Sequence, residues 1–496
     1  MSTAVFGDMK RLTSSIGVYA FASFAQKGLA FLLIPIYTRH IDTSEYGVLE
    51  LLSAFSTIFF GVLGLGLASA LMKCFHRDCR DREDQERILA TAAIVALPVL
   101  LIGGGLAIAF AEPLSRMLFD SEGSAELVRL VSITGVLSSL TFLTLSELRA
   151  EERSAAYSTV VLLQFLIAGL LNILFVVKFN MGIRGVLWGN LASYICALPV
   201  AVALASRRSR FAVSPVLVRP LLAFGLLMVP GVLTGWVNNL SDRYILKLLT
   251  DLDQVAIYGI GYKFGTVIRL VVVWPFQLAW PAFAFAISDR EDHKSTYAHT
   301  LTYLAAVLAT SVLGISILSR VVVPWVVGDA YQEAYRVVPL VALSYAFSGI
   351  FFCLNPGVHI AGKTRYFPLL SVLTAALNVG LNFLLIPKFG MMGAAAATAG
   401  SFFLSAFGAW VLAQRFYPVD YEYGRLLKIV VAGILTWLIA TRLPAAATLS
   451  SWLWYVIWAT FGFPVFLVAT KFFTGEEWNA IRRRLRVLLG RIRRSS

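Results

Sequence analysis

Three cationic side chains lie deep inside long apolar runs of this chain. Lys27 interrupts SFAQKGLAFLLIP, and Lys263 and Arg269 interrupt YGIGYKFGTVIRLVVVWPF. A charge exposed to hydrocarbon costs at least about 2.5–3.5 kcal/mol at the centre of a membrane helix. We therefore expect these groups to face a water-filled cavity or an acidic partner. A guanidinium suits phosphate because it can donate two parallel hydrogen bonds. The pattern favours a cationic site for an anionic substrate.

The sequence leaves two interpretations of Lys27 open. It lies about fifteen residues into its run, or roughly 22 Å along a helix that rises 1.5 Å per residue. Its side chain is too short to reach the surface from there. Lys27 either binds this anion or pairs with Glu50, an acidic residue of the next run and the one we nominate for ion coupling. Lys263 lies nearer the outer end of its run and could reach the interface instead.

The elements that position these residues are membrane helices. The 496 residues are 58% hydrophobic and 14% charged, with a mean hydropathy of +0.77. Apolar runs long enough to cross about 30 Å of hydrocarbon recur along the whole chain. They predict an all-α integral membrane protein with about 14 spans, at residues 12–38, 45–72, 88–111, 126–148, 155–179, 184–206, 218–240, 254–287, 296–325, 333–361, 366–387, 389–415, 424–442 and 450–473.

The net charge of +14 follows membrane topology rather than a nucleic-acid surface. Lys and Arg number 28 in the connections predicted inside and 11 in those predicted outside. This bias predicts that both termini are cytoplasmic. The outside connections are short, which disfavours a membrane enzyme with an external catalytic domain. No CxxC pair, Walker A, HExxH or structured GxSxG motif is present, so we predict no metal, cofactor or catalytic residue.

An internal repeat relates the two halves of the chain. NILFVVKFNMGIRGV in the first half matches NFLLIPKFGMMGAAA in the second at an offset of 210 residues. The pair Tyr46-Gly47 matches Tyr258-Gly259 at an offset of 212. An offset of this size equals six spans, an even number, so both copies keep one orientation. The repeat predicts two parallel six-helix lobes around a central cavity.

The repeat also sets the predicted boundaries and pairs the polar residues. The N-lobe is 1–211, the C-lobe is 212–416, two extra spans occupy 417–473, and a basic amphipathic tail occupies 474–496. Gln26 and Lys27 then correspond to Asn238 and Asn239. These amides either line the cavity and bind sugar or hydrogen-bond between helices. Asp242 and Arg243, at the outer end of the seventh span, are predicted to form a local ion pair.

Three longer passages resemble the Wzx-type polysaccharide flippases of the multidrug/oligosaccharidyl-lipid/polysaccharide (MOP) exporter superfamily. They are LIPIYTRHIDTSEYGVLELL, NNLSDRYILKLLTDLDQVAIYGIGYKF and HIAGKTRYFPLL. The resemblance covers nearly the whole chain and is stronger for the fold than for the substrate. It implies a protein of the bacterial inner membrane. Its substrate would be an oligosaccharide linked to undecaprenyl pyrophosphate, moved from the cytoplasmic to the periplasmic leaflet for surface polysaccharide synthesis.

Other transport functions remain alternatives on the sequence. A drug or cation exporter of the same superfamily should carry acidic residues in its cavity, whereas the deep charges here are cationic. A lipid II flippase would carry another anionic substrate and is the nearer competitor. Proton or sodium coupling is a further expectation. We expect the protein to contact membrane lipids, and a polysaccharide polymerase is a candidate partner.

Overall fold

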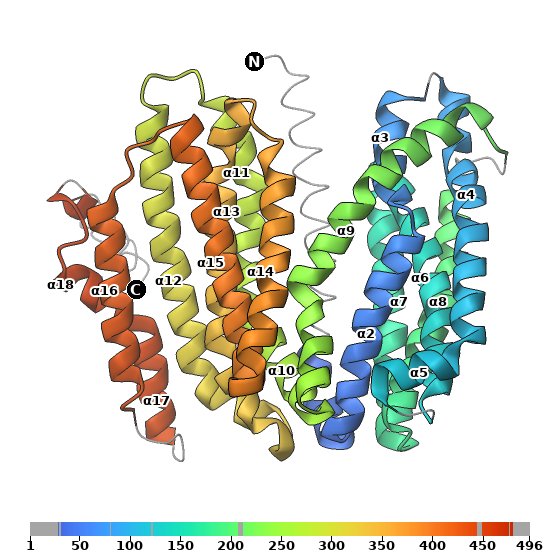
Figure 1. Ribbon diagram of the computed structural model, residues 1–496, viewed down its shortest axis with the longest axis horizontal. Coiled ribbons are helices and arrows are strands. Elements are labelled where there is room, and N and C mark those ends of the chain that lie inside the picture. Colours follow the sequence, from blue (N-terminus) through green and yellow to red (C-terminus); the bar gives the residue numbers. More distant parts are fainter. Residues whose placement is uncertain are drawn as a thin grey trace, which may run out of the picture. The chain divides into compact units, whose positions relative to one another are not determined.

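The computed structural model describes residues 28, 31–79, 81–120, 123–206, 212–443, 449–475 and 477–479 (Figure 1). Within these residues the regular structure is helical, without strands. Thirteen of the helices are long and apolar enough to span a membrane. The first predicted span is helical over 31–40, and the rest of it lies outside the described residues. The predicted all-α membrane fold is confirmed.

In the first half of the chain, the spans follow one another with short connections. The elements are α2 (Thr43–Leu63), α3 (Leu67–Arg77), α4 (Arg82–Ala109), α5 (Ala111–Phe119), α6 (Ala125–Ala150), α7 (Ser154–Ile173), η1 (Leu174–Lys178) and α8 (Gly182–Ala205). Asp81 caps α4, because its carboxylate accepts a hydrogen bond of 2.8 Å from the backbone N–H of Asp84. Such a cap satisfies one of the amide groups left free in the first turn.

The second half contains two helices of 34 and 35 residues. Its elements are α9 (Pro215–Leu249), α10 (Leu252–Gly265), η2 (Arg269–Val273), α11 (Trp274–Ala286), α12 (His293–Val326), η3 (Asp329–Arg336), α13 (Val338–Ile360), α14 (Tyr366–Phe389), α15 (Met391–Phe416), α16 (Tyr423–Ala440), α17 (Leu449–Ile457), η4 (Trp458–Gly462) and α18 (Phe463–Ala469).

Glycine and proline shape the helices that lie near the candidate site. The predicted span 45–72 is divided into α2 and α3 by a bend at Gly66, which has a φ of +62°. A Cβ at Gly66 would overlap the carbonyl oxygen of Gly225, so this bend needs glycine on both counts. Helix α9 is visibly bent in Figure 1 and contains Pro220 and Pro230, each of which removes a helical hydrogen bond.

Within the described parts of the chain, three spans contain a single turn of π-helix. These turns are η1, η2 and η4, and each continues directly from a preceding α-helix or into a following one. A π-helical turn inserts one residue into the α-helical pattern and is often found at functional sites. One of the three, η2, begins at Arg269, a residue singled out from the sequence.

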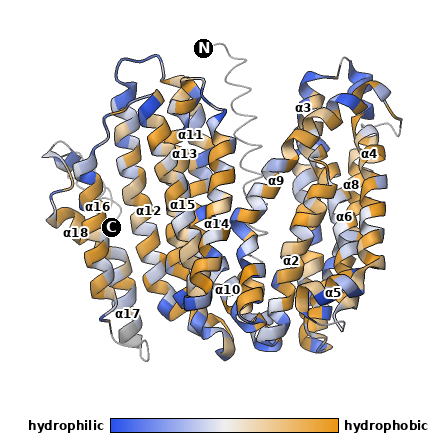
Figure 2. Cartoon of the chain, viewed as in Figure 1, coloured by the Kyte–Doolittle hydropathy of each residue, from blue (hydrophilic) through white to orange (hydrophobic). Residues whose placement is uncertain are grey.

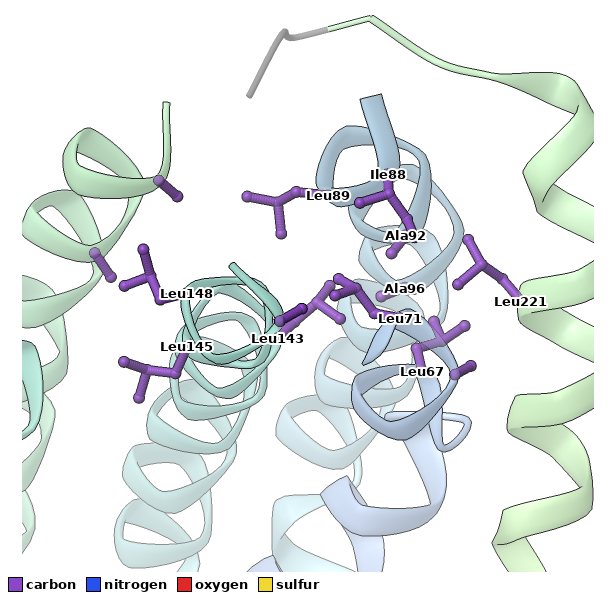
Figure 3. Packing of buried hydrophobic residues seen from close by; sticks show 14 of the residues in the cluster. Leu67, Leu71, Ile88, Leu89, Ala92, Ala96, Leu143, Leu145, Leu148 and Leu221 are labelled. Atoms are coloured by element: carbon purple, nitrogen blue, oxygen red, sulfur yellow. The ribbon is translucent and has the colours of Figure 1, made fainter. Parts of the chain in front are cut away.

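The chain divides into two compact units. Unit 1 comprises residues 1–259, 326–331 and 382–391. Its core is built from α3, α4, α6, α7, α8 and α9. Figure 3 shows leucine, isoleucine and alanine side chains from these helices meeting there, including Leu71, Ile88 and Leu148. Small residues at such positions let helices approach closely.

Unit 2 comprises residues 260–325, 332–381 and 392–496. One of its cores joins α12 and α16 to α17 and α18 through Ile317, Ala432 and Phe463. Many large apolar side chains outside the cores are exposed, as expected for helices that face lipid, and Figure 2 shows hydrophobic residues along most helices. The predicted boundaries of the lobes, the two extra spans and the tail stay predictions.

Candidate functional site

A buried ion pair joins α2 to α9 inside unit 1. Arg243 Nε lies 3.1 Å from Glu50 Oε2, and both side chains are almost fully buried. The two residues are 193 positions apart in the sequence. Two further hydrogen bonds hold the same helices together, from Trp236 Nε1 to the carbonyl of Ala54 at 2.9 Å and from Tyr244 to the carbonyl of Leu51 at 2.8 Å. The ion pair therefore lies in a well-fixed helix contact.

Further polar groups surround the guanidinium of Arg243. Its Nη1 donates to Asp242 Oδ1 at 3.2 Å and to the backbone carbonyl of Asn239 at 3.0 Å. The hydroxyl of Tyr258 donates to the other carboxylate oxygen of Asp242, and the Tyr258 ring lies 5.7 Å from the guanidinium carbon. We call Glu50, Asp242, Arg243 and Tyr258 the buried network. Asp242 and Arg243 do pair, as expected, but inside a buried network rather than as an isolated pair.

The repeated Tyr-Gly pair has a structural reason in both copies. Tyr46 and Tyr258 are fully buried. A Cβ at Gly259 would lie 2.6 Å from the carboxylate carbon of Glu50, and a Cβ at Gly47 would overlap the backbone of Leu252. Each glycine therefore makes room for another element, and in the second copy that element carries the buried network.

A second set of contacts in unit 1 joins segments predicted to lie at the outer face. The backbone N–H of Gly328 donates to Thr38 Oγ1 at 3.0 Å. Tyr331 donates to the carbonyl of Ile41 at 2.8 Å, and its ring meets Tyr46 edge-on at 5.7 Å. Burial raises the pKa of Tyr331, so its hydroxyl remains a neutral donor. We call these five residues the outer contact, which links the two halves of the sequence.

Arg269, in unit 2, has a very different environment. Its side chain is exposed, although it belongs to the continuous helical span Leu252–Ala286. The ring of Tyr345 on α13 lies 5.7 Å from the guanidinium carbon, and the Tyr345 hydroxyl bonds that of Tyr262 at 3.0 Å. Among the residues that the structure describes, the side chain of Arg269 forms no ion pair or hydrogen bond. Its five N–H donors are therefore available to a ligand.

The other predicted site residues fall into three groups. Lys27 and Gln26 lie outside the described residues. Lys263, on α10, is half-buried. Asn238 is half-buried with a buried amide oxygen that accepts no hydrogen bond within the described chain, whereas Asn239 donates to the carbonyl of Gly235 at 2.8 Å. Glu50, the alternative partner proposed for Lys27, forms an ion pair with Arg243. The roles of all six residues stay predictions.

Tyr345 and Tyr262 were not singled out from the sequence. Both lie in apolar spans, where a tyrosine does not differ in pattern from a core aromatic residue. An indirect signal exists for Tyr262, because it immediately precedes Lys263 in the YGIGYKF passage. Metal chemistry gains no support from the described part of the chain, in which no three His, Cys, Asp or Glu residues gather as ligands.

Comparison with known proteins gives a family match and several fold matches. The family model described as "Polysaccharide biosynthesis protein" matches residues 12–287. The succinoglycan biosynthesis transport protein ExoT of Rhizobium meliloti (strain 1021) is 23% identical over 340 residues, which are 68% of this chain. The chain spans 66% of that relative, just under two thirds of its length.

Solved transporter structures share the fold. The lipid II flippase MurJ, in an inward closed conformation, matches with a TM-score of 0.71 over 90% of this chain and 97% of its own, at 13% identity. An inward-facing multidrug resistance MATE family transporter of the MOP superfamily matches with a TM-score of 0.67, over 79% of this chain and 93% of its own, also at 13% identity. At these identities the likeness shows the fold alone.

Proposed function

The chain belongs to the polysaccharide biosynthesis protein family, and on this premise we propose that it is a flippase for a lipid-linked oligosaccharide. The family and the fold support a multi-pass membrane transporter of the MOP superfamily. The finer proposal is that its substrate is an oligosaccharide on undecaprenyl pyrophosphate. The substrate would pass from the cytoplasmic to the periplasmic leaflet by alternating access of two lobes in the bacterial inner membrane.

The exposed guanidinium of Arg269 carries this proposal. A charged group within a span is stable only where water, a partner or a ligand reaches it. Arg269 meets an aromatic ring and has no acidic partner in the described chain. A pyrophosphate supplies the missing negative charge, and a guanidinium can bind it through two parallel hydrogen bonds. The cationic sign also disfavours a cationic drug as the substrate.

We propose distinct roles for the other predicted residues. Lys27 and Lys263 add positive charge to the cavity that receives the pyrophosphate, and Gln26, Asn238 and Asn239 offer amides to the sugars. Glu50 is our candidate for coupling to protons or sodium, through its pair with Arg243. The outer contact would separate when the substrate leaves towards the periplasm, because it joins the two halves of the chain.

Translocation by the purified full-length chain tests the proposal. The protein is reconstituted into proteoliposomes that carry a fluorescent oligosaccharide on undecaprenyl pyrophosphate, and a glycan-cleaving enzyme outside reports the outer leaflet. We expect protein-dependent movement of this lipid. Parallel vesicles carry lipid II, whose pyrophosphate Arg269 would equally accept. Movement of lipid II alone would assign the protein to the competing function, and movement of neither lipid would refute the proposal.

A further inference from the structure

Three cations gather where α13 ends, α14 begins and α15 ends. They are Lys363, Arg365 and Arg415. None of the three forms an ion pair with any residue that the structure describes. All lie in unit 2, on the side that the charge bias predicts to be cytoplasmic. Three nearby charges of one sign repel one another, so their convergence calls for an anion.

A stacked pair of aromatic rings holds these cations together. Tyr366 and Phe416 stack with ring centroids 5.3 Å apart. The Lys363 ammonium and the Arg415 guanidinium each lie 5.8 Å from the centroid of the Phe416 ring, and the Arg365 guanidinium lies 5.2 Å from that of Tyr366. Each cation packs against the face of an aromatic ring and not against a carboxylate. Its positive charge is therefore not neutralised by an acidic side chain in the described part of the chain.

The backbone around the cations is ordered by a defined helix end. Gly362, with a φ of +67°, terminates α13. Its N–H bonds the carbonyl of His359 at 2.9 Å, and that of Lys363 bonds the carbonyl of Val358 at 3.1 Å. These two bonds form a Schellman motif, which fixes the direction of the chain at Lys363. Helix α14 starts three residues later, so its positive N-terminal end adds to the field of the cations.

Exposed apolar side chains continue from the cations along both helices. On α14, Leu369 follows Arg365 by one turn and is 65% exposed, and Leu373 lies one turn further at 53%. On α15, Val411 and Phe407 precede Arg415 by one and two turns, at 42% and 51% exposure. Residues four apart share one face of a helix. The surface is thus cationic at one end and apolar below it.

We propose that this surface is a binding site for an anionic phospholipid. The lipid phosphate lies among Lys363, Arg365 and Arg415, and the acyl chains run along Leu369 and Leu373 of α14 and the matching face of α15. The positive-inside tendency explains basic residues in such a connection, but it does not require them to converge on one aromatic stack. A soluble phosphate would use the cations and leave the apolar faces without a role.

The full-length chain in nanodiscs tests this site without any glycolipid substrate. Discs are made from zwitterionic phosphatidylcholine with or without phosphatidylglycerol, and native mass spectrometry counts the lipids that remain bound after release. A triple variant carries Lys363→Gln, Arg365→Gln and Arg415→Gln. Three basic residues at a membrane surface contribute enough to weaken phosphatidylglycerol binding by about 100-fold when removed. Equal retention by wild type and variant would overturn the proposal.

Two controls separate the site from charge alone and from free phosphate. Arg77→Gln, Arg82→Gln and Arg219→Gln remove the same charge at exposed positions elsewhere and should leave the tightly bound lipid in place. Phe416→Leu keeps all three cations but removes the ring that two of them share, and should weaken binding by about 2–5-fold. Equal retention of phosphatidylcholine, or displacement of phosphatidylglycerol by millimolar inorganic phosphate, would contradict a phospholipid site. These readouts do not depend on transport activity.

Discussion

Arg243 and Arg269 are the same side chain in two opposite situations. Arg243 is almost fully buried and is bound by Glu50, Asp242 and a backbone carbonyl. Arg269 is exposed within its span and lies beside the ring of Tyr345, with no ion pair among the residues described. The first guanidinium has its hydrogen bonds and charge satisfied by the protein. The second has no such partner in the described part of the chain, where water or a ligand can satisfy it.

This difference separates a residue that stabilises the fold from a residue that is available to bind a ligand. Removing one member of a buried ion pair leaves the other charge stranded in a low dielectric, which destabilises the fold. Removing an exposed charge that has no protein partner leaves the fold nearly unchanged and affects whatever the charge binds. The buried network and Arg269 should therefore respond to mutation in different measurements. Substitutions of Arg243, Arg269 and Tyr345 test this in order of expected size, with Arg320 as a control.

Arg243→Met should have the largest effect. It strands the carboxylates of Glu50 and Asp242, and breaking a buried pair in this way costs about 3–5 kcal/mol of unfolding free energy. Denaturant unfolding in detergent measures the change. Arg269→Met is the matched control and should cost less than about 0.5 kcal/mol, as for an exposed position without a structural role. Equal losses in the two variants would remove the distinction between them.

Arg269→Gln should act mainly on transport. A hydrogen bond to a charged group contributes about 1.5–3 kcal/mol, which corresponds to a decrease of roughly 10–100-fold in translocation at low substrate. Arg269→Lys keeps the charge but loses the fork of donors and should lie in between. Initial rates in proteoliposomes measure both.

Arg320 provides a matched control for Arg269. It also lies in a span and over a tyrosine ring, 5.9 Å from that of Tyr455, but it donates to the carbonyl of Ala440 at 2.8 Å. Arg320→Gln should lower stability and leave the transport rate of folded protein unchanged. If it slows transport as much as Arg269→Gln does, the lack of a protein partner is not what matters.

Substitutions of Tyr345 should have the smallest effect. Tyr345→Leu removes the ring beside Arg269, and a cation–π contact contributes about 0.5–1 kcal/mol, so transport should fall by about 2–5-fold. Tyr345→Phe keeps the ring and loses only the bond to Tyr262. We expect it to behave nearly as wild type. A Phe variant as slow as the Leu variant would show that the hydroxyl, and not the ring, positions the guanidinium.

Much of the fold could be predicted from the sequence because lipid imposes a simple rule on composition. Each span is a run of apolar residues, and its length follows from the thickness of the bilayer. The deep charges were visible for the same reason, since Arg269 stands out against LVVV and WPF. What the sequence could not supply was the partner of each charge. Glu50 and Arg243 are 193 residues apart. Helical periodicity shows which residues share one face of a helix, but it does not show which other helix packs against that face.

The bend at Gly66 and the π-helical turns could not be predicted from the sequence pattern. The run that forms α2 and α3 reads as one span, and only the packing of Gly66 against Gly225 shows why it divides. Asp242 and Arg243 are adjacent in the sequence and suggested a local pair for that reason alone. Their burial depends on α2 and on Tyr258, which lie elsewhere in the chain.

The π-helical turn that begins at Arg269 changes how this span can be edited. A π turn carries one residue more than the α-helical turn it replaces. The side-chain faces of α11 therefore do not continue the α-helical periodicity of α10. Deleting Val271 or Val272 would restore a regular helix and rotate everything beyond it by about 100°, the angle of one residue. The extra residue therefore sets the rotation of α11 about its axis. A chain one residue shorter here would turn a different face of α11, with the same amino acids, towards its surroundings.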